Sequence, residues 1–128
     1  MKRRALIVAG PFALGGCGRK KPTAGAALPA GSTVLALGDS ITFGTGADSA
    51  AAYPAQLAAL AGWSVVNAGV PGDTATQAAE RLPTLLTEHK PALVIPSAGG
   101  NDLLRRVPAA ETEAALRNAI GLAREAGA

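Results

Sequence analysis

The sequence has 128 residues, of which 48% are apolar and only 3% aromatic, and it carries a formal net charge of +3. This length suits a single domain, with a core that must be built from Ala, Val, Leu and Ile. Six of the twelve basic residues lie within the first 21 positions, so the other six face nine acidic residues and leave a net charge of −3. The chain therefore lacks the basic surface typical of proteins that bind nucleic acid.

The first residues have the pattern of a targeting signal. Lys2, Arg3 and Arg4 precede an apolar stretch at residues 5–14, which is too short to span a bilayer. The following sequence LGGC, which ends at Cys17, resembles the lipobox of bacterial lipoproteins. That resemblance implies cleavage before Cys17 and attachment of lipid to its thiol. An ordinary secretory signal with a chance cysteine, or a disordered start, remains the alternative.

This interpretation divides the chain into three parts. Residues 1–16 form a lipoprotein signal peptide, residues 17–32 a flexible tether with Pro22 and Pro29, and residues 33–128 the domain. Several acyl chains on Cys17 would anchor the protein stably, since each buried CH₂ contributes about 0.8 kcal/mol. We expect a protein attached to a membrane of the bacterial cell envelope. Because Cys17 is the only cysteine, an intramolecular disulfide is excluded.

Strand and helix patterns alternate along the domain. We predict strands at 33–37, 64–67 and 92–95, and helices at 50–61, from Asp73 or Thr74 to about 88, and at 109–126. This order implies right-handed crossovers and a parallel sheet with helices on its faces. Pro83 predicts an irregularity in the second helix. Pro96 predicts an early end or a distortion of the third strand, because proline lacks an N–H.

Each predicted strand ends in a polar, glycine-rich loop, and we expect the three loops to converge at the edge where such sheets bind ligands. An acyl-transfer site needs a nucleophile, donors for the oxyanion and a base. Ser40 is the candidate nucleophile. Gly72, whose N–H is not shielded by a Cβ, and Asn101, whose side chain carries an NH₂, are the candidate oxyanion donors.

The segments that hold these residues resemble a known family. GDSIT at 38–42, NAGVPGDT at 67–74 and GGND at 99–102 are similar to the first three sequence blocks of the GDSL, or SGNH, hydrolases. The run ERLPTLLTEHKPALVI is most similar to their bacterial thioesterase/lysophospholipase/arylesterase branch. The resemblance covers residues 34 to about 123. It implies a flavodoxin-like, three-layer α/β/α fold, hydrolysis of small carboxylic ester or thioester substrates, and neither a metal nor a cofactor.

The resemblance also implies roles for individual residues. Ser40 would be the nucleophile, and its backbone N–H, the Gly72 N–H and the Asn101 side chain would hold the oxyanion. The family takes its Asp and His from a late Asp-x-x-His block, which is missing here, so the domain is expected to be C-terminally truncated and its activity impaired. The single histidine, His89, precedes the third predicted strand, so we expect it at the opposite edge of the sheet as a solvated helix-end residue.

Other functions remain open. Glycine loops at helix starts can cradle phosphate, which would make the domain a small-ligand binding module, although no dinucleotide or P-loop motif is present. A catalytically inactive lipoprotein remnant would share every residue with the enzyme. Structural roles are expected for several residues: a turn for Gly69, a loop buttress for Asp39, a helix cap for Asp73, and a solvated surface for Arg105 and Arg106. For Ser40, a simple turn residue is the alternative to the nucleophile.

The lipobox generates the first prediction. When the full chain is expressed in a bacterium and the cells are fractionated, the protein should be found with the membranes, and Cys17→Ser should move it to the soluble fraction. A wild-type chain that stays soluble, or a Cys17→Ser chain that is found equally with the membranes, would contradict lipid attachment.

Overall fold

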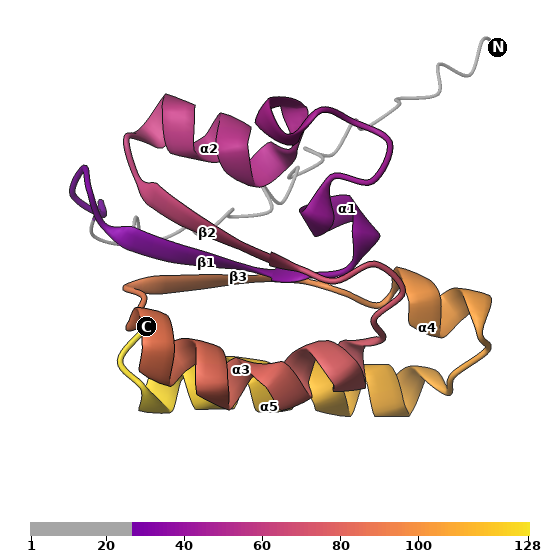
Figure 1. The fold of residues 1–128 in the computed structure, drawn as a ribbon. Coiled ribbons are helices and arrows are strands. Elements are labelled where there is room, and N and C mark those ends of the chain that lie inside the picture. The colour runs from indigo at the N-terminus through magenta and orange to yellow at the C-terminus, as the bar shows by residue number, and fades with distance from the viewer. Residues whose placement is uncertain (1–26) are drawn as a thin grey trace, which may run out of the picture.

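The computed structural model describes residues 27–128, which form a three-layer α/β/α domain around a parallel sheet (Figure 1). The sheet has the strand order β2-β1-β3, with β1 (Thr33–Gly38) between β2 (Ser64–Gly69) and β3 (Leu93–Ser97). The predicted signal peptide, Cys17 and most of the predicted tether lie outside the described residues. This architecture confirms the fold class expected from the alternating strand and helix patterns.

Helices cover both faces of the sheet. Figure 1 shows α1 (Ser40–Phe43) and α2 (Tyr53–Ala61) on one face, and α3 (Ala75–His89) and α5 (Ala109–Glu125) on the other. The 3-10 helix η1 (Ser49–Ala51) precedes α2, and α4 (Gly100–Leu104) lies beyond the carboxyl end of β3. No helix within residues 27–128 is both long and apolar enough to cross a membrane.

The central strand is buried on both faces because helices pack above and below it. Val34 to Leu37 are all at most 1% exposed, as expected for a parallel strand with an unbroken apolar run. Side chains alternate between the faces, and Leu35 and Leu37 pack with Ala78 and Leu82 of α3. Small alanines on α3 and α5 let the two helices lie close to the sheet and to each other. The core therefore forms without large aromatic side chains.

The helix α3 begins with a capping box. The Thr74 hydroxyl accepts a hydrogen bond from the Gln77 N–H, and the Gln77 side chain accepts one from the Thr74 N–H, which satisfies N–H groups that a helix start leaves unpaired. Asp73, the residue that we expected to act as the cap, is not the N-cap, because its carboxylate pairs with Arg81 instead. The helix continues through Pro83 without a break.

The third strand corrects the expectation for Pro96. The strand does not end early: β3 extends to Ser97, and Pro96 stays in register with Leu37 of β1. Proline is tolerated in edge strands, where not every backbone N–H is needed by a neighbour. Within the described residues β3 is an edge strand, with β1 on one side only.

Gly69 has a packing role rather than the turn role that we expected. It lies within β2, and a Cβ built on it would be 2.2 Å from the Phe43 backbone nitrogen. No side chain fits in this space, so only glycine lets α1 lie directly on the end of the strand. The position of Ser40, the first residue of α1, therefore depends on the missing side chain of Gly69.

This contact predicts opposite effects for two glycine-to-alanine substitutions. Gly69→Ala should lower the free energy of unfolding by about 1–3 kcal/mol, because backbone atoms must move to accept the methyl group. Gly121→Ala in α5 is the control. A Cβ there meets nothing within 4 Å, so the higher helix propensity of alanine should raise stability by about 0.5–1 kcal/mol. Urea unfolding measures both, and equal effects would contradict the close approach.

Candidate active site

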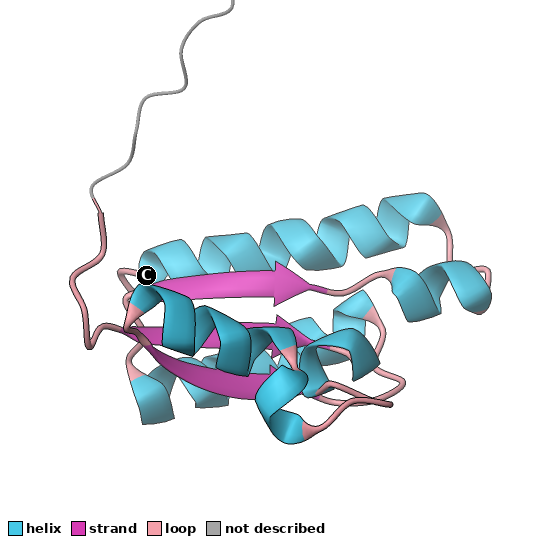
Figure 2. Ribbon diagram, turned by 90° about the horizontal axis from the view of Figure 1, so that it is seen from above, coloured by secondary structure: helices cyan, strands magenta, loops and turns pink. Residues whose placement is uncertain are grey.

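The three loops predicted to converge lie at the same edge of the sheet. Figure 2 shows the three strands pointing the same way, with the loops and short helices gathered beyond their tips. One backbone hydrogen bond and one close approach join the loops. The Val70 N–H donates to the Gly38 carbonyl over 3.0 Å, and a Cβ built on Gly100 would lie 3.7 Å from Asp39 Oδ2. The segments after β1, β2 and β3 are therefore neighbours.

Ser40 opens a single helical turn where the sequence predicted a loop. Asp39 is the N-cap of α1, and its Oδ1 accepts a 2.9 Å hydrogen bond from the Ile41 N–H. The Asp39 side chain is buried, with the residue only 4% exposed. The expectation that Asp39 buttresses the loop is thus confirmed. Ser40 itself is half-buried and is the first residue of this capped turn.

Two further side chains, which sequence reasoning missed, hold α1 in place. The hydroxyl of the fully buried Thr42 lies 3.2 Å from the Tyr53 hydroxyl of α2. Asn67 of β2 donates to the Phe43 carbonyl over 3.3 Å and accepts from the Gly69 N–H over 3.0 Å. Asn67 stands at the start of the NAGVPGDT block, which is the signal that could have revealed it.

Gly72 lies in a turn that requires glycine. Its φ of +87° falls in the left-handed region that side chains disfavour. The turn is closed by the Asp73 N–H, which donates to the Val70 carbonyl over 3.2 Å. On its outer side, Arg105 Nη2 donates to the Gly72 carbonyl over 2.8 Å. Arg105 is exposed as expected, but it has this specific contact in addition.

Asn101 lies against the same turn. It is the second residue of α4, and its Nδ2 donates a 2.9 Å hydrogen bond to the Asp73 carbonyl. An asparagine amide carries two N–H groups. The contact with Asp73 occupies one, and it fixes the plane of the amide so that the other has a defined direction. The structure therefore brings Gly72 and Asn101 together, with Ser40 on the adjoining loop.

Asp102, next to Asn101, joins three helices and was not recognised as important from the sequence. It is 1% exposed, and its Oδ2 accepts from the Ala75 N–H over 2.8 Å. Its Oδ1 accepts from the Thr112 hydroxyl over 3.1 Å. A carboxylate at the start of α3 also interacts favourably with the helix dipole. Asp102 thus fixes α4, and with it Asn101, against α3 and α5.

His89 lies where the sequence predicted it, away from these loops. It is the last residue of α3, four residues before β3 begins, and so it is at the amino edge of the sheet. Its Nε2 lies 3.8 Å from a carboxylate oxygen of its neighbour Glu88. Within residues 27–128, no group of three or more His, Cys, Asp or Glu side chains is arranged to hold a metal ion.

Comparison with known proteins places the chain in a family. The model of the GDSL-like lipase/acylhydrolase family matches residues 36–128, which include all three converging loops. The chain belongs to this family. Thioesterase 1/protease 1/lysophospholipase L1 of Escherichia coli (strain K12) is 43% identical over 95 residues, which cover 71% of this chain and 45% of that protein. Esterase TesA of Pseudomonas aeruginosa is 39% identical over 104 residues, 77% of this chain and 52% of that protein.

Solved structures agree with this family assignment. The crystal structure of AlinE4, an SGNH-hydrolase family esterase, superposes with a TM-score of 0.71 at 32% identity. The match covers 77% of this chain and 56% of that one. A crystal structure of TesA gives the same TM-score at 42% identity, covering 75% of this chain and 56% of that one. The chain thus spans about half the length of the GDSL-like relatives that it matches.

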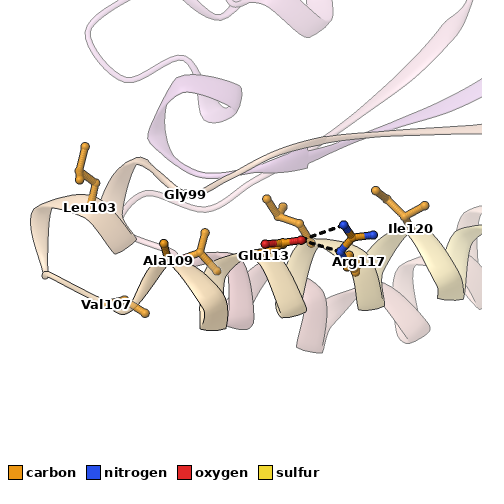
Figure 3. Close-up of a pocket in the computed structure, with 9 residues that line it drawn as sticks. Gly99, Leu103, Val107, Ala109, Glu113, Arg117 and Ile120 are labelled. Carbon is orange, nitrogen blue, oxygen red and sulfur yellow. Dashed lines mark hydrogen bonds and ion pairs between the residues drawn. The ribbon is translucent and has the colours of Figure 1, made fainter.

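A cavity of about 570 Å³ lies beside α4 and α5 in this GDSL-like domain. Figure 3 shows it between α4 and α5, with Leu103, Val107 and Ile120 among its apolar lining and the Glu113–Arg117 ion pair beside them. Of the residues in the loops, Gly99 reaches it, but Ser40, Gly72 and Asn101 do not line it. This cavity is therefore not the place where the candidate nucleophile could act.

The contacts of Asp102 generate the next prediction. Asp102→Ala should lower the free energy of unfolding by about 2 kcal/mol, because it leaves the buried Ala75 N–H without its charged acceptor. Glu113→Ala is the control, since its exposed pair with Arg117 should contribute about 0–0.5 kcal/mol. Urea unfolding curves of both variants provide the measurement. Equal midpoints for the two would show that Asp102 does not hold the helices together.

Proposed function

We propose that this domain contributes the nucleophile and the oxyanion donors of a serine hydrolase that acts on carboxylic esters or thioesters. The observation that carries the proposal is the 2.9 Å hydrogen bond from Asn101 Nδ2 to the Asp73 carbonyl. This bond holds the Gly72 turn against Asn101, at the edge of the sheet where α1 begins with Ser40. The names of the relatives, which include a thioesterase, an esterase and an arylesterase, support this class of substrate.

In the proposed reaction, Ser40 Oγ attacks the carbonyl carbon of the substrate while a base accepts the hydroxyl proton. The negative charge that develops on the carbonyl oxygen is stabilised by the Ser40 N–H, the Gly72 N–H and the second N–H of Asn101. Each such donor contributes a factor of about 10²–10³ in rate. Collapse of the tetrahedral intermediate expels an alcohol or a thiol, and water then releases the acyl group from Ser40.

The residues assigned so far do not include a base that could take the proton from the Ser40 hydroxyl. A serine hydroxyl is a weak nucleophile until a base takes its proton, and the only histidine of the chain lies at the other edge of the sheet. We propose that the base belongs to a region corresponding to the half of the relatives that this chain does not span. The 128 residues alone should therefore be a poor catalyst.

We also propose that the domain is held at a membrane of the cell envelope by lipid on Cys17. This proposal rests on the sequence motif LGGC and the basic and apolar segments before it. It would place the hydrolase at a membrane surface, in a compartment outside the cytoplasm.

The function is tested with the 128-residue chain on a short-chain aryl ester and an acyl thioester. We expect slow hydrolysis, at most about 10³–10⁴-fold above the rate in water, which is what remains in a serine protease without its triad. Because that residual rate comes from the oxyanion donors and from binding, Ser40→Ala should change it little in the 128-residue chain, but in a chain extended by whatever its gene encodes downstream it should abolish the faster turnover. Ser49→Ala, a change at an exposed serine of η1, is the matched control and should leave the rate unchanged.

Two results would contradict this account. Turnover by the extended chain that is the same with Ser40 and with Ser40→Ala would exclude Ser40 as the nucleophile. Rapid turnover that Ser40→Ala abolishes would show that a base exists within the 128 residues, and His89→Ala would then be the first variant to examine. A chain extended by whatever its gene encodes downstream should hydrolyse the same substrates much faster if that region supplies the base.

A further inference from the structure

Arg81 of α3 contacts the ends of two strands and the turn that carries Gly72. Its Nε donates to Asp73 Oδ2 over 2.9 Å, and its Nη2 lies 2.8 Å from the same oxygen. Nη2 also lies 3.3 Å from the Gly38 carbonyl and 3.2 Å from the Ala68 carbonyl, to both of which it donates. One guanidinium group thus joins the last residue of β1, the penultimate residue of β2 and the residue after Gly72.

These contacts connect Arg81 to each proposed catalytic group. Gly38 is separated from Ser40 only by Asp39. Asp73 follows Gly72 directly, and the Asp73 carbonyl is the acceptor that fixes the Asn101 amide. A shift of Asp73 would therefore move the Gly72 peptide and release Asn101 together, while a shift of Gly38 would move the start of α1.

The position of Arg81 favours this linking role. The Arg81 side chain is 30% exposed and the Asp73 side chain 12% exposed, so the pair is partly shielded from water and is screened less than a surface pair. A planar guanidinium has several donors in a fixed fork, whereas a lysine ammonium is a compact point charge. Arg81 also stands on a helix that is anchored in the core by its neighbours Ala78 and Leu82.

We propose that Arg81 is a positioning residue for the oxyanion hole, which sets the Gly72–Asp73 turn against Asn101 and against the start of α1. Arg81 does not touch the reacting atoms, and it acts through Asp73 and the two carbonyls. The inference rests on the proposed function for its catalytic consequence. The proposed effect of Arg81 on the placement of the Gly72 N–H and the Asn101 amide can be measured without any turnover.

The test uses the 128-residue chain with the substitution Arg81→Met, which keeps most of the side-chain length and removes the charged fork. Arg117→Met is the matched control. It makes the same change in another arginine that binds a carboxylate over 2.8 Å, but on the exposed surface of α5. Arg81→Lys tests whether a positive charge without the fork is enough. Thermal unfolding of each variant sets an assay temperature at which all are folded.

The first measurement is the ¹H–¹⁵N spectrum of each variant. With Arg81→Met, the backbone signal of Gly72 and the side-chain NH₂ signals of Asn101 should shift, and those of α5 should not. With Arg117→Met, the pattern should be reversed. Arg81→Lys should give intermediate shifts for Gly72 and Asn101. Unchanged Gly72 and Asn101 signals in folded Arg81→Met, or in Arg81→Lys if the Met variant does not fold, would overturn the proposal.

The second measurement separates positioning from stability by steady-state hydrolysis of the aryl ester. Arg81→Met should lower kcat about 10- to 100-fold with little change in KM, because misplaced groups weaken binding of the transition state more than of the ground state. Arg81→Lys should recover part of the loss, and Arg117→Met should match the wild type. A kcat that is unchanged in folded Arg81→Met would overturn the proposal, even if the variant is less stable.

The two measurements also distinguish this inference from the proposed function. If hydrolysis by the chain extended by its downstream region does not depend on Ser40, the proposed activity of these residues fails and the spectra alone decide whether Arg81 sets the turn. If hydrolysis depends on Ser40 but neither the spectra nor kcat respond to Arg81→Met, the function stands and the positioning role does not.

Discussion

The turn at Gly72 and Asp73 is the point on which the candidate site depends. Three side chains from different elements hold it. Asn101 of α4 binds the Asp73 carbonyl, Arg81 of α3 binds the Asp73 carboxylate, and Arg105 after α4 binds the Gly72 carbonyl. A backbone N–H stabilises an oxyanion when its direction is fixed in advance. The three contacts that hold this turn therefore matter more together than any one of them does alone.

The same edge of the sheet holds three buried carboxylates, on Asp39, Asp73 and Asp102. A buried charge is costly unless it is paired or hydrogen-bonded. Each of these has such a partner: a helix N–H for Asp39, an arginine for Asp73, and a helix N–H with a hydroxyl for Asp102. All three therefore serve the architecture of the loops. The polar groups around Ser40, the candidate nucleophile, are thus satisfied within the protein.

The sequence predicted the long elements well because their signals are local. The apolar run at the start of the domain gave β1, and the alanine- and leucine-rich stretches gave α2, α3 and α5, with ends within a few residues of those observed. The one-turn helices α1 and α4 were taken for loops, since four or five residues are too few to show a helical period. The convergence of the three loops followed from the parallel order of the strands.

What the sequence could not predict are the pairings between distant residues. Asp73 was preferred over Thr74 as the cap of α3, but Thr74 is the N-cap and the Asp73 carboxylate pairs with Arg81, a contact that no capping rule includes. Arg81 itself gave a signal, because it is a charge next to the buried positions Ala78 and Leu82 of an amphipathic helix. Pro96 was misjudged because its tolerance depends on which strands flank β3, and strand order is not a local property.

The position at which the chain enters the sheet determines where a preceding segment joins the domain. Residues 31 and 32 are tied to the region of β2 by the hydrogen bonds Gly31 N to Gly62 O and Ser64 N to Ser32 O. From there β1 runs for six residues to Ser40's loop, a distance of about 20 Å. The chain therefore enters the sheet at the edge opposite Ser40, so a segment attached ahead of residue 31 joins the domain at the far end of β1 from the three converging loops.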